Sequence, residues 1–259
     1  MGAEHLLLFH NQGRGSPLPR YRRFGEDEEE EEEWSPLDLG NDLEIWYDFS
    51  DISTLYQDTS RTNPVTANNQ YIYGLEDKSG KGRHNRKRGG NPQYKANLKN
   101  GLSGIWWPGN AYMYGADVTI SQPFTVITAV YHSTDSPDRI VGLPSAGTES
   151  SQKAIISSSS NVISGVDTFL INQWNIVSYL YTTQNLGYST IRMNGAVIKT
   201  GWSGNNGTQR IVLSSSQSAY GNNYWYGYYA ELIWVKDYAS DMCETVEAYL
   251  SNKWDIALS

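Results

Sequence analysis

The sequence lacks the marks of several common protein classes. Cys243 is its single cysteine, so no disulfide can form within the chain and a disulfide-stapled secreted scaffold is excluded. No apolar run approaches the ~20 residues that cross a bilayer. The short apolar run at residues 6–9 follows Glu4 and His5, where a signal peptide has basic residues. We therefore expect neither a membrane segment nor export by the ordinary secretory route.

Ligand sets for metals are also missing. The four histidines are scattered and there is no cysteine pair, which excludes the usual zinc sites. Asp48, Asp51 and Asp77 carry oxygens of the kind that Ca²⁺ accepts. Each of them lies among turn-forming residues, where an Asp side chain caps backbone N–H groups. We therefore expect turn capping, and neither a metal nor a cofactor.

The net charge of −8 comes from one segment, residues 26–33, which are eight consecutive acids; elsewhere acidic and basic side chains balance. Such a run repels itself and does not fold alone. The residues before it are rich in Gly, Pro and Arg, which favours an extended chain. We predict that residues 1–41 are an arm that docks on a neighbouring subunit or on its own domain. Its candidate contact residues are Arg14, Arg20, Arg22, Arg23, Glu28 and Glu30.

Residues 42–259 are typical of one β-sandwich domain. The 19 Tyr and 9 Trp of the whole chain, against 5 Phe, suit sheets whose outer faces are partly solvated. Runs of β-branched and aromatic residues predict strands at 124–131, 174–181 and 228–235. Asn194-Gly195 lies between two further runs and is typical of a type I′ hairpin turn.

Only the last segment, residues 240–254, has a helical period. Its apolar stripe must dock on a sheet, because so short a helix is marginal alone. We expect Ser240 or Asp241 as N-cap, with Glu244 reaching back to the first turn, and Glu231 and Glu247 as surface carboxylates. The stripe is formed by Cys243, Val246, Leu250 and Trp254.

Three blocks of sequence carry a resemblance. Residues 46–51 read Trp-x-Asp-x-Ser-Asp, residues 77–82 read Asp-Lys-Ser-Gly-Lys-Gly, and residues 228–256 combine the last strand with the helix. Together they resemble LamG-like domains of the concanavalin A-like lectin/glucanase superfamily, a variety abundant in virion proteins of tailed phages and large DNA viruses and in bacterial surface proteins. The resemblance implies a mostly β, jelly-roll sandwich with one short C-terminal helix, here preceded by the extended arm.

Glucanases of this superfamily require two Glu and an Asp on one strand, with acid and nucleophile about 5–5.5 Å apart. No strand has the Glu-x-Asp-x-x-Glu spacing; Glu44 and Asp48 come nearest but lack the third acid. We therefore expect no enzymatic activity.

Residues 81–88 hold five basic side chains in eight positions. Such a cluster can neutralise phosphates of a nucleic acid, meet an acidic protein segment such as residues 26–33, or remain solvated. The opposite charge within the same chain favours the acidic partner, so we assign partner contacts to Arg83, Arg86, Lys87 and Arg88.

Aromatic residues crowd positions 220–229 between Gly and Asn. Sugar rings stack on flat aromatics and Asn amides can bond their hydroxyls, so this loop suits glycan binding. Tyr and Trp are also enriched at subunit contacts, and alternate residues of the strand must face the core. The candidate sugar residues are Trp202, Asn222, Asn223, Tyr224, Trp225 and Tyr226, with Trp106-Trp107 as secondary candidates.

The sequence thus predicts a non-enzymatic virion protein, a capsid decoration or tail component that is fastened by its arm to other virion proteins, with self-association and binding of a host-surface glycan as further expectations. The rival interpretation is a carbohydrate-binding or carbohydrate-degrading module of a bacterial surface protein. A third is an internal capsid protein whose basic loop touches the genome, although nucleic acid is disfavoured by the acidic partner.

Overall fold

The computed structural model describes residues 33–115, 118–133, 139–143, 154–157, 172–182, 189–201, 211–214 and 224–259. The chain divides into two units, Met1–Glu33 and Trp34–Ser259, and the description that follows concerns the second. That unit begins earlier than residue 42, because Trp34 and Leu39 already pack on its core. The candidate contacts in the arm, from Arg14 to Glu30, lie outside the described residues.

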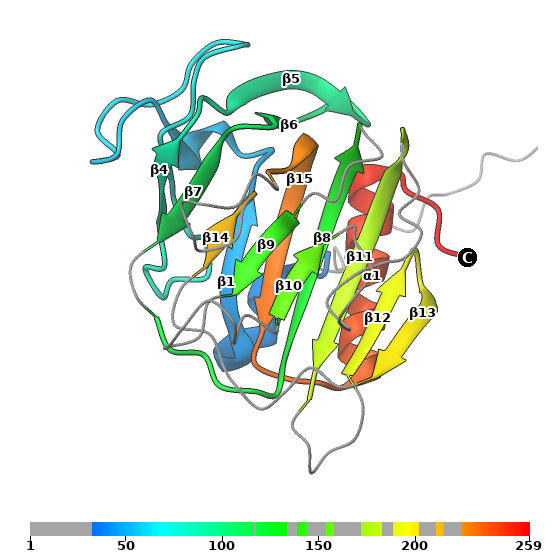
Figure 1. Cartoon of the computed structure of the whole chain (residues 1–259). Coiled ribbons are helices and arrows are strands. Elements are labelled where there is room, and N and C mark those ends of the chain that lie inside the picture. Colours follow the sequence, from blue (N-terminus) through cyan, green and yellow to red (C-terminus); the bar gives the residue numbers. More distant parts are fainter. Residues whose placement is uncertain are drawn as a thin grey trace, which may run out of the picture. The chain divides into compact units, whose positions relative to one another are not determined.

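Among the described residues, fifteen strands form two antiparallel sheets (Figure 1). The eight-stranded sheet has the order β13-β12-β11-β8-β15-β6-β5, with β1 also paired to β15, and the seven-stranded sheet has the order β10-β9-β14-β7-β4-β3-β2. The strands are β1 Leu43–Asp48, β2 Leu55–Tyr56, β3 Gly74–Leu75, β4 Asn85–Gly89, β5 Gln93–Lys99, β6 Leu102–Pro108, β7 Tyr112–Gly115, β8 Phe124–His132, β9 Arg139–Leu143, β10 Ala154–Ser157, β11 Trp174–Tyr181, β12 Ser189–Met193, β13 Ala196–Gly201, β14 Val212–Leu213 and β15 Tyr226–Val235.

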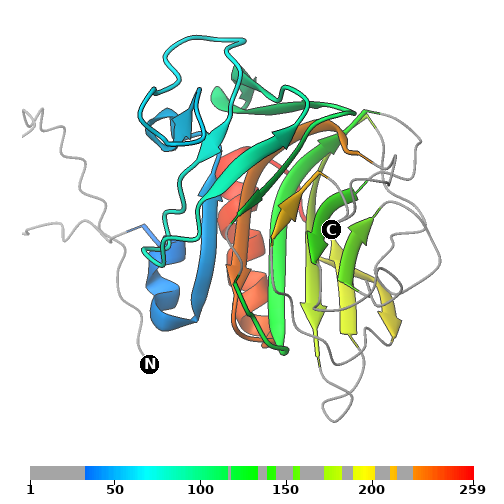
Figure 2. The ribbon, with the colours of Figure 1, turned by 60° about the vertical axis from the view of Figure 1, so that its left-hand side comes forward.

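The described helical segments are the 3-10 helices η1, Pro36–Asp42, and η2, Ile52–Thr54, and the α-helix α1, Ser240–Trp254. α1 lies along the eight-stranded sheet (Figure 2). No helix among the described residues is long and apolar enough to cross a membrane.

The alternation of side chains along each strand divides the sandwich into two apolar clusters. One alternate set, which includes Tyr47, Trp107, Val130 and Trp234, fills the space between the sheets. The other set, which includes Ile127, Ile176 and Ile233, faces outward and packs under α1. The predicted strands at 124–131, 174–181 and 228–235 are confirmed, and so is the 194–195 turn, where both residues have positive φ.

The predicted stripe of α1 is also confirmed, since Cys243, Val246, Leu250 and Trp254 are all fully buried. The predicted cap is wrong. Ala239 is the N-cap and makes no side-chain cap bond. Glu244 bonds Arg192 at 3.2 Å and does not reach back to the first turn. The burial of the stripe on the sheet holds α1 in place without a side-chain cap.

The sequence analysis placed Glu231 and Glu247 on the surface, and this prediction is wrong. Both carboxylates are buried beneath α1. A register shift between Tyr229 and Glu231 puts Ala230 and Glu231 on the same outer face. Each carboxylate oxygen of Glu231 accepts two donors. Oε1 accepts from Trp46 Nε1 at 2.6 Å and Tyr249 Oη at 3.0 Å, and Oε2 accepts from Trp254 Nε1 at 3.0 Å and pairs with Lys253 Nζ at 2.7 Å.

Glu247 makes a second attachment of the helix. Its carboxylate accepts from Ser178 Oγ on β11 at 2.7 Å and from the guanidinium of Arg192 on β12. Periodicity cannot reveal such positions, because the donors of these buried carboxylates come from other elements: β11 and β12 for Glu247, and β1 and α1 for Glu231. The two carboxylates fix α1 in one position over β11, β12 and β15.

We predict that Glu231→Ala lowers the free energy of unfolding by about 3–5 kcal/mol, because Lys253 and two indole N–H groups lose their buried acceptor. Urea unfolding measures this loss. The control is Glu244→Ala on the exposed side of α1, where the side chain is 60% exposed and the expected change is within ~0.5 kcal/mol. Equal effects of the two substitutions would contradict the prediction.

Candidate functional site

The turn at residues 74–82 positions the first cluster of candidate residues. Asp77 is buried, and its carboxylate accepts from the backbone N–H groups of Trp46, Ser79 and Arg83 at 2.9–3.0 Å. Gly80 and Gly82 have φ values of 80° and 68°, which only glycine adopts without strain. The turn capping expected for Asp77 is confirmed, and it directs the chain of residues 81–84 across the edge of the sandwich.

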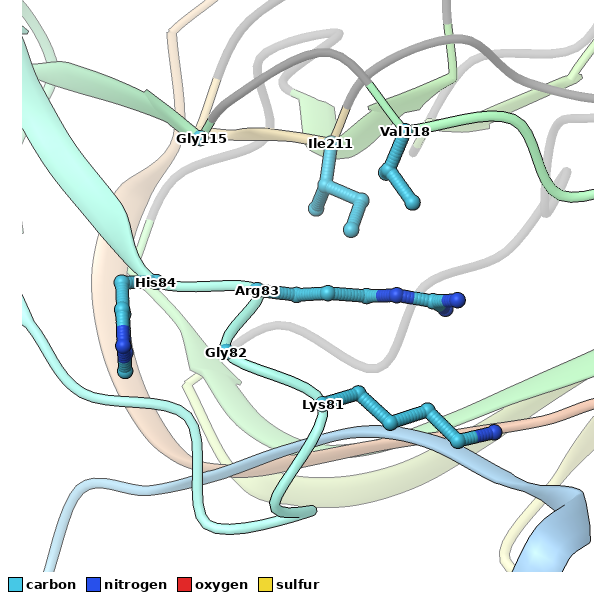
Figure 3. Close-up of a pocket in the computed structure, with 7 residues that line it drawn as sticks. All are labelled: Lys81, Gly82, Arg83, His84, Gly115, Val118 and Ile211. Atoms are coloured by element: carbon cyan, nitrogen blue, oxygen red, sulfur yellow. The ribbon is translucent and has the colours of Figure 1, made fainter.

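A cavity of about 200 Å³ lies beside this segment. Its lining contains two cations, one histidine and four aliphatic or glycine residues. Figure 3 shows the Arg83 side chain extending across it, with Val118 and Ile211 on one side and Lys81 on the other. The lining residues are Lys81, Gly82, Arg83, His84, Gly115, Val118 and Ile211.

Glu44 of β1 neutralises part of this charge. Lys81 Nζ lies 2.8 Å from Glu44 Oε1, and Arg83 Nη1 pairs with Glu44 Oε2. The Glu44 side chain is only 7% exposed. Burial, followed by the charge of Arg61, lowers the pKa of His84, whose Nδ1 accepts from the Asp77 N–H at 3.1 Å. His84 is therefore neutral at pH 7, and the cavity is cationic through Lys81 and Arg83.

The other predicted bases lie on β4. Arg86 and Arg88 are exposed, and Arg88 lies over the ring of Tyr114 at 4.1 Å. Lys87 lies over the ring of Tyr73 at 3.8 Å. The predicted group of Arg83, Arg86, Lys87 and Arg88 is thus divided between the cavity and the strand, and whether these residues meet an acidic partner stays a prediction.

The described residues of the predicted sugar site, Tyr224, Trp225 and Tyr226, do not share one surface. The ring of Tyr224 stacks on that of Tyr112, with 5.8 Å between the centroids. The side chain of Met113, the next residue after Tyr112, is in the core. Trp225 is fully buried and stacks on His132 at 4.3 Å. Tyr226 instead contacts Trp106 of β6 at 4.8 Å. Consecutive side chains of an extended segment point in opposite directions, so Trp225 enters the core and cannot present its ring to a sugar. Trp202, Asn222 and Asn223 lie outside the described residues.

Tyr226 belongs to a larger aromatic group on the outer face of the eight-stranded sheet. Trp106 pairs in register with Tyr228, Tyr228 with Tyr131, and Tyr131 with Trp174. These four aromatics form one row across β6, β15, β8 and β11, with neighbouring ring centroids 4.7–5.7 Å apart. We call Trp106, Tyr131, Trp174, Tyr226 and Tyr228 the aromatic row.

The aromatic row is partly exposed. Tyr226 is 37% exposed, and the other four members are half-buried. Burial, followed by the neighbouring phenols of Tyr131 and Tyr226, raises the pKa of Tyr228. Of the secondary candidates Trp106 and Trp107, Trp107 fills the core and Trp106 faces outward.

Sequence reasoning missed Tyr131, Trp174 and Tyr228 as a group, because they come from three strands. The sequence signal that could have found them is the alternation of inward and outward side chains along each strand. Each precedes or follows a core position in its strand, but only the sheet order brings the outward positions side by side.

One pair of carboxylates, Asp48 and Glu231, has pKa values shifted in opposite directions, as in a catalytic pair of general acid and nucleophile. Asp48 and Glu231 are cross-strand neighbours, and both contact Lys253 Nζ, at 3.0 and 2.7 Å. Burial and the charge of Asp48 raise the pKa of Glu231. Burial also acts to raise the pKa of Asp48, but Lys253, Ser50 and Lys78 outweigh it and leave that pKa below its usual value.

This pair is closed to a substrate. Glu231 is fully buried, and both of its oxygens are filled by donors. Asp51, the third acid of the region, bonds Lys78 at 2.8 Å. Among the described residues, no group of three or more His, Cys, Asp or Glu is placed to hold a metal. The carboxylates therefore serve as hydrogen-bond and ion-pair partners within the fold.

We predict that Asp48→Asn makes the melting temperature depend less on pH in the acidic range. A carboxyl whose folded pKa is depressed contributes stability above its unfolded pKa of about 4 and loses it as pH falls through the folded pKa. The variant should therefore be less stable than the wild type at neutral pH and approach it at low pH. Melting temperatures from neutral pH down to about pH 3 measure this, with Asp255→Asn, whose side chain is 78% exposed, as control. A constant difference at every pH would contradict the prediction.

The sequence matches no protein-family model and no curated protein. Solved structures are similar in fold. One is domain 4 of AbnA, a GH43 extracellular arabinanase from Geobacillus stearothermophilus, in complex with arabinotriose, with a TM-score of 0.51 and 15% identity over 80% of this chain and 98% of that one.

Another is an arabinofuranosidase complexed with arabinofuranosyl-α-1,2-xylobiose, with a TM-score of 0.57 and 13% identity over 83% of this chain. The match spans 64% of that enzyme. At these identities the likeness shows the fold alone: the chain is a mostly β, two-sheet antiparallel sandwich with a C-terminal helix, as the resemblance of its motifs predicted.

Proposed function

We propose that Trp34–Ser259 is a carbohydrate-binding sandwich domain without catalytic activity, and that the aromatic row is its sugar-binding surface. The observation that carries the proposal is the in-register row itself. Four aromatics on adjacent strands, with Tyr226 beside them, are partly exposed on a face whose other apolar positions are covered by α1. Isolated exposed aromatics are ordinary, but a contiguous group of them indicates a binding surface.

The chemistry of the row suits a sugar. Indole and phenol rings offer flat apolar surfaces to the C–H faces of a sugar, and phenol hydroxyls can bond its hydroxyl groups. Neighbouring strands are about 4.8 Å apart, so the row extends roughly 14 Å across the sheet. That length exceeds one sugar ring, which favours an oligosaccharide as ligand. The similar AbnA domain, in complex with arabinotriose, makes arabino-oligosaccharides the first probes.

The arrangement of the carboxylates supports a binding role over hydrolysis. Hydrolysis of a glycosidic bond needs an acid and a nucleophile or base that both reach the bond. Asp48 and Glu231 have divergent pKa values, as such a pair would, but Glu231 is enclosed by Trp46, Tyr249 and Trp254. Its raised pKa follows from burial in the fold, and no substrate contact is needed to explain it.

The virion role stays a prediction. It depends on the arm and on contacts with other virion proteins, and residues 1–32 of the arm, with nearly all of the acidic run, lie outside the described residues. A carbohydrate-binding sandwich is compatible both with display on a particle and with the rival module of a bacterial surface protein, so the two interpretations differ in location and not in the surface proposed here.

We predict that Trp106→Ala and Tyr226→Ala each weaken oligosaccharide binding at least about tenfold, the equivalent of 1.4 kcal/mol. A glycan array that includes arabino-oligosaccharides identifies the ligand, and calorimetric titration measures its affinity. The control is Tyr71→Ala, which removes an exposed tyrosine, 44% exposed, outside the row.

Two results would contradict the proposal. One is glycan binding that Trp106→Ala and Tyr226→Ala leave unchanged. The other is an array without any bound glycan together with a protein that self-associates and loses self-association in Trp106→Ala, since Tyr and Trp also form subunit contacts. Light scattering on the same variants distinguishes these outcomes.

A further inference from the structure

The cavity beside residues 81–84 has the components of an anion site, separate from the aromatic row. It is lined by Lys81 and Arg83, and its volume of about 200 Å³ is smaller than that of pockets for drug-sized ligands. Its remaining walls are Val118, Ile211 and two glycines. The space therefore suits a small ligand, or one group of a larger ligand, that has an anionic part and an apolar part.

Arg83 is fixed by its backbone before any ligand arrives. Its N–H donates to Asp77 Oδ2 at 2.9 Å, and its carbonyl accepts from the buried hydroxyl of Tyr47 at 2.5 Å. The guanidinium is anchored through Nη1 alone, to the carboxylate and the carbonyl of Glu44. Within the described part of the chain, Nε and Nη2 of Arg83 have no hydrogen-bond partner. A preorganised guanidinium with spare donors matches a planar oxyanion.

The charges around the cavity favour a monoanion. Among the described residues, Lys81 and Arg83 share the single carboxylate of Glu44, so the described part of the lining carries one more positive than negative charge. Asp77 lies behind the loop, and its oxygens are occupied by backbone N–H groups and by Ser79. His84 is neutral because burial lowers its pKa. A carboxylate completes this balance better than a doubly charged phosphate.

The two glycines of the lining allow the backbone conformation and close packing found beside the cavity. A Cβ on Gly115 would lie 2.7 Å from the carbonyl oxygen of His84, so a side chain there would displace the start of β4. Gly82 has φ +68°, a conformation that other residues rarely adopt. Figure 3 shows Ile211 and Val118 pointing toward Arg83 from the opposite wall. The apolar pair and the guanidinium thus face each other across the space.

We propose that this cavity binds a small carboxylate, held by Arg83 and Lys81, with its hydrocarbon part against Val118 and Ile211. The carboxylate can belong to a free organic acid or to an acidic sugar, and both present the same group to Arg83. The proposal does not depend on glycan binding at the aromatic row.

Titration of the full chain with acetate, glucuronate, glucose and inorganic phosphate, followed by NMR or calorimetry, tests the proposal. We expect acetate and glucuronate to bind with millimolar dissociation constants, on the order of −4 kcal/mol. Arg83→Gln should weaken both at least about tenfold, since the charge-assisted fork is lost. Arg86→Gln, an exposed arginine three positions along the chain, and Trp106→Ala should leave acetate binding unchanged.

Glu44→Gln gives the sharpest result. It frees both cations from their protein counter-charge, so carboxylate affinity should rise, whereas a merely damaged cavity would bind less. Val118→Phe fills the space without changing charge and should weaken binding. Thermal melts establish that each variant is folded.

Tighter binding of glucuronate than of acetate would identify an acidic sugar as the source of the carboxylate, and equal binding would identify a free acid. Carboxylate affinity that is unchanged in Arg83→Gln or lowered in Glu44→Gln would overturn the proposal. So would the absence of carboxylate binding, or binding of phosphate alone.

Discussion

The buried carboxylate of Glu231 is the point at which β1, β15 and α1 meet. It accepts donors from Trp46 on β1 and from Tyr249, Lys253 and Trp254 on α1, while its own strand, β15, lies between β8 on one side and β1 and β6 on the other. A charge in this position is costly unless every oxygen is occupied. The position of α1 over the eight-stranded sheet is therefore set by the demands of one carboxylate as well as by its apolar stripe.

The placement of α1 determines which part of the outer face remains available. The helix covers Ile127, Ile176 and Ile233, and its last residue, Trp254, stacks on Trp174 at 6.4 Å. Beyond that contact the outward positions of β8, β15 and β6 are aromatic and partly exposed. Strand alternation, sheet order and the end of the helix thus combine to present one contiguous aromatic surface.

The turn at residues 74–82 both attaches β1 to the loop and positions the cations beside the cavity. Asp77 ties β1 to the loop through the N–H of Trp46, and the same carboxylate holds the backbone of Arg83. Glu44, near the start of β1, then receives Lys81 and Arg83. A motif whose local purpose is to close a turn therefore also positions two cations beside a cavity.

Elements with local causes could be predicted from the order of the residues alone. The 194–195 turn follows from Asn-Gly and its positive φ, the stripe of α1 from helical spacing, and the cap at Asp77 from the turn chemistry around Ser79 and Gly80. Only the tertiary structure decided what depends on partners far apart in the chain. Adjacent Tyr224, Trp225 and Tyr226 read as one aromatic loop, but an extended backbone sends Trp225 into the core. Glu231 and Glu247 read as surface acids, because the donors that permit their burial lie up to 185 residues away. The local pattern of residues determines secondary structure and turns. Which side chains are buried, and which lie together on one surface, depends on the order of strands in the sheets and on how the sheets and the helix pack.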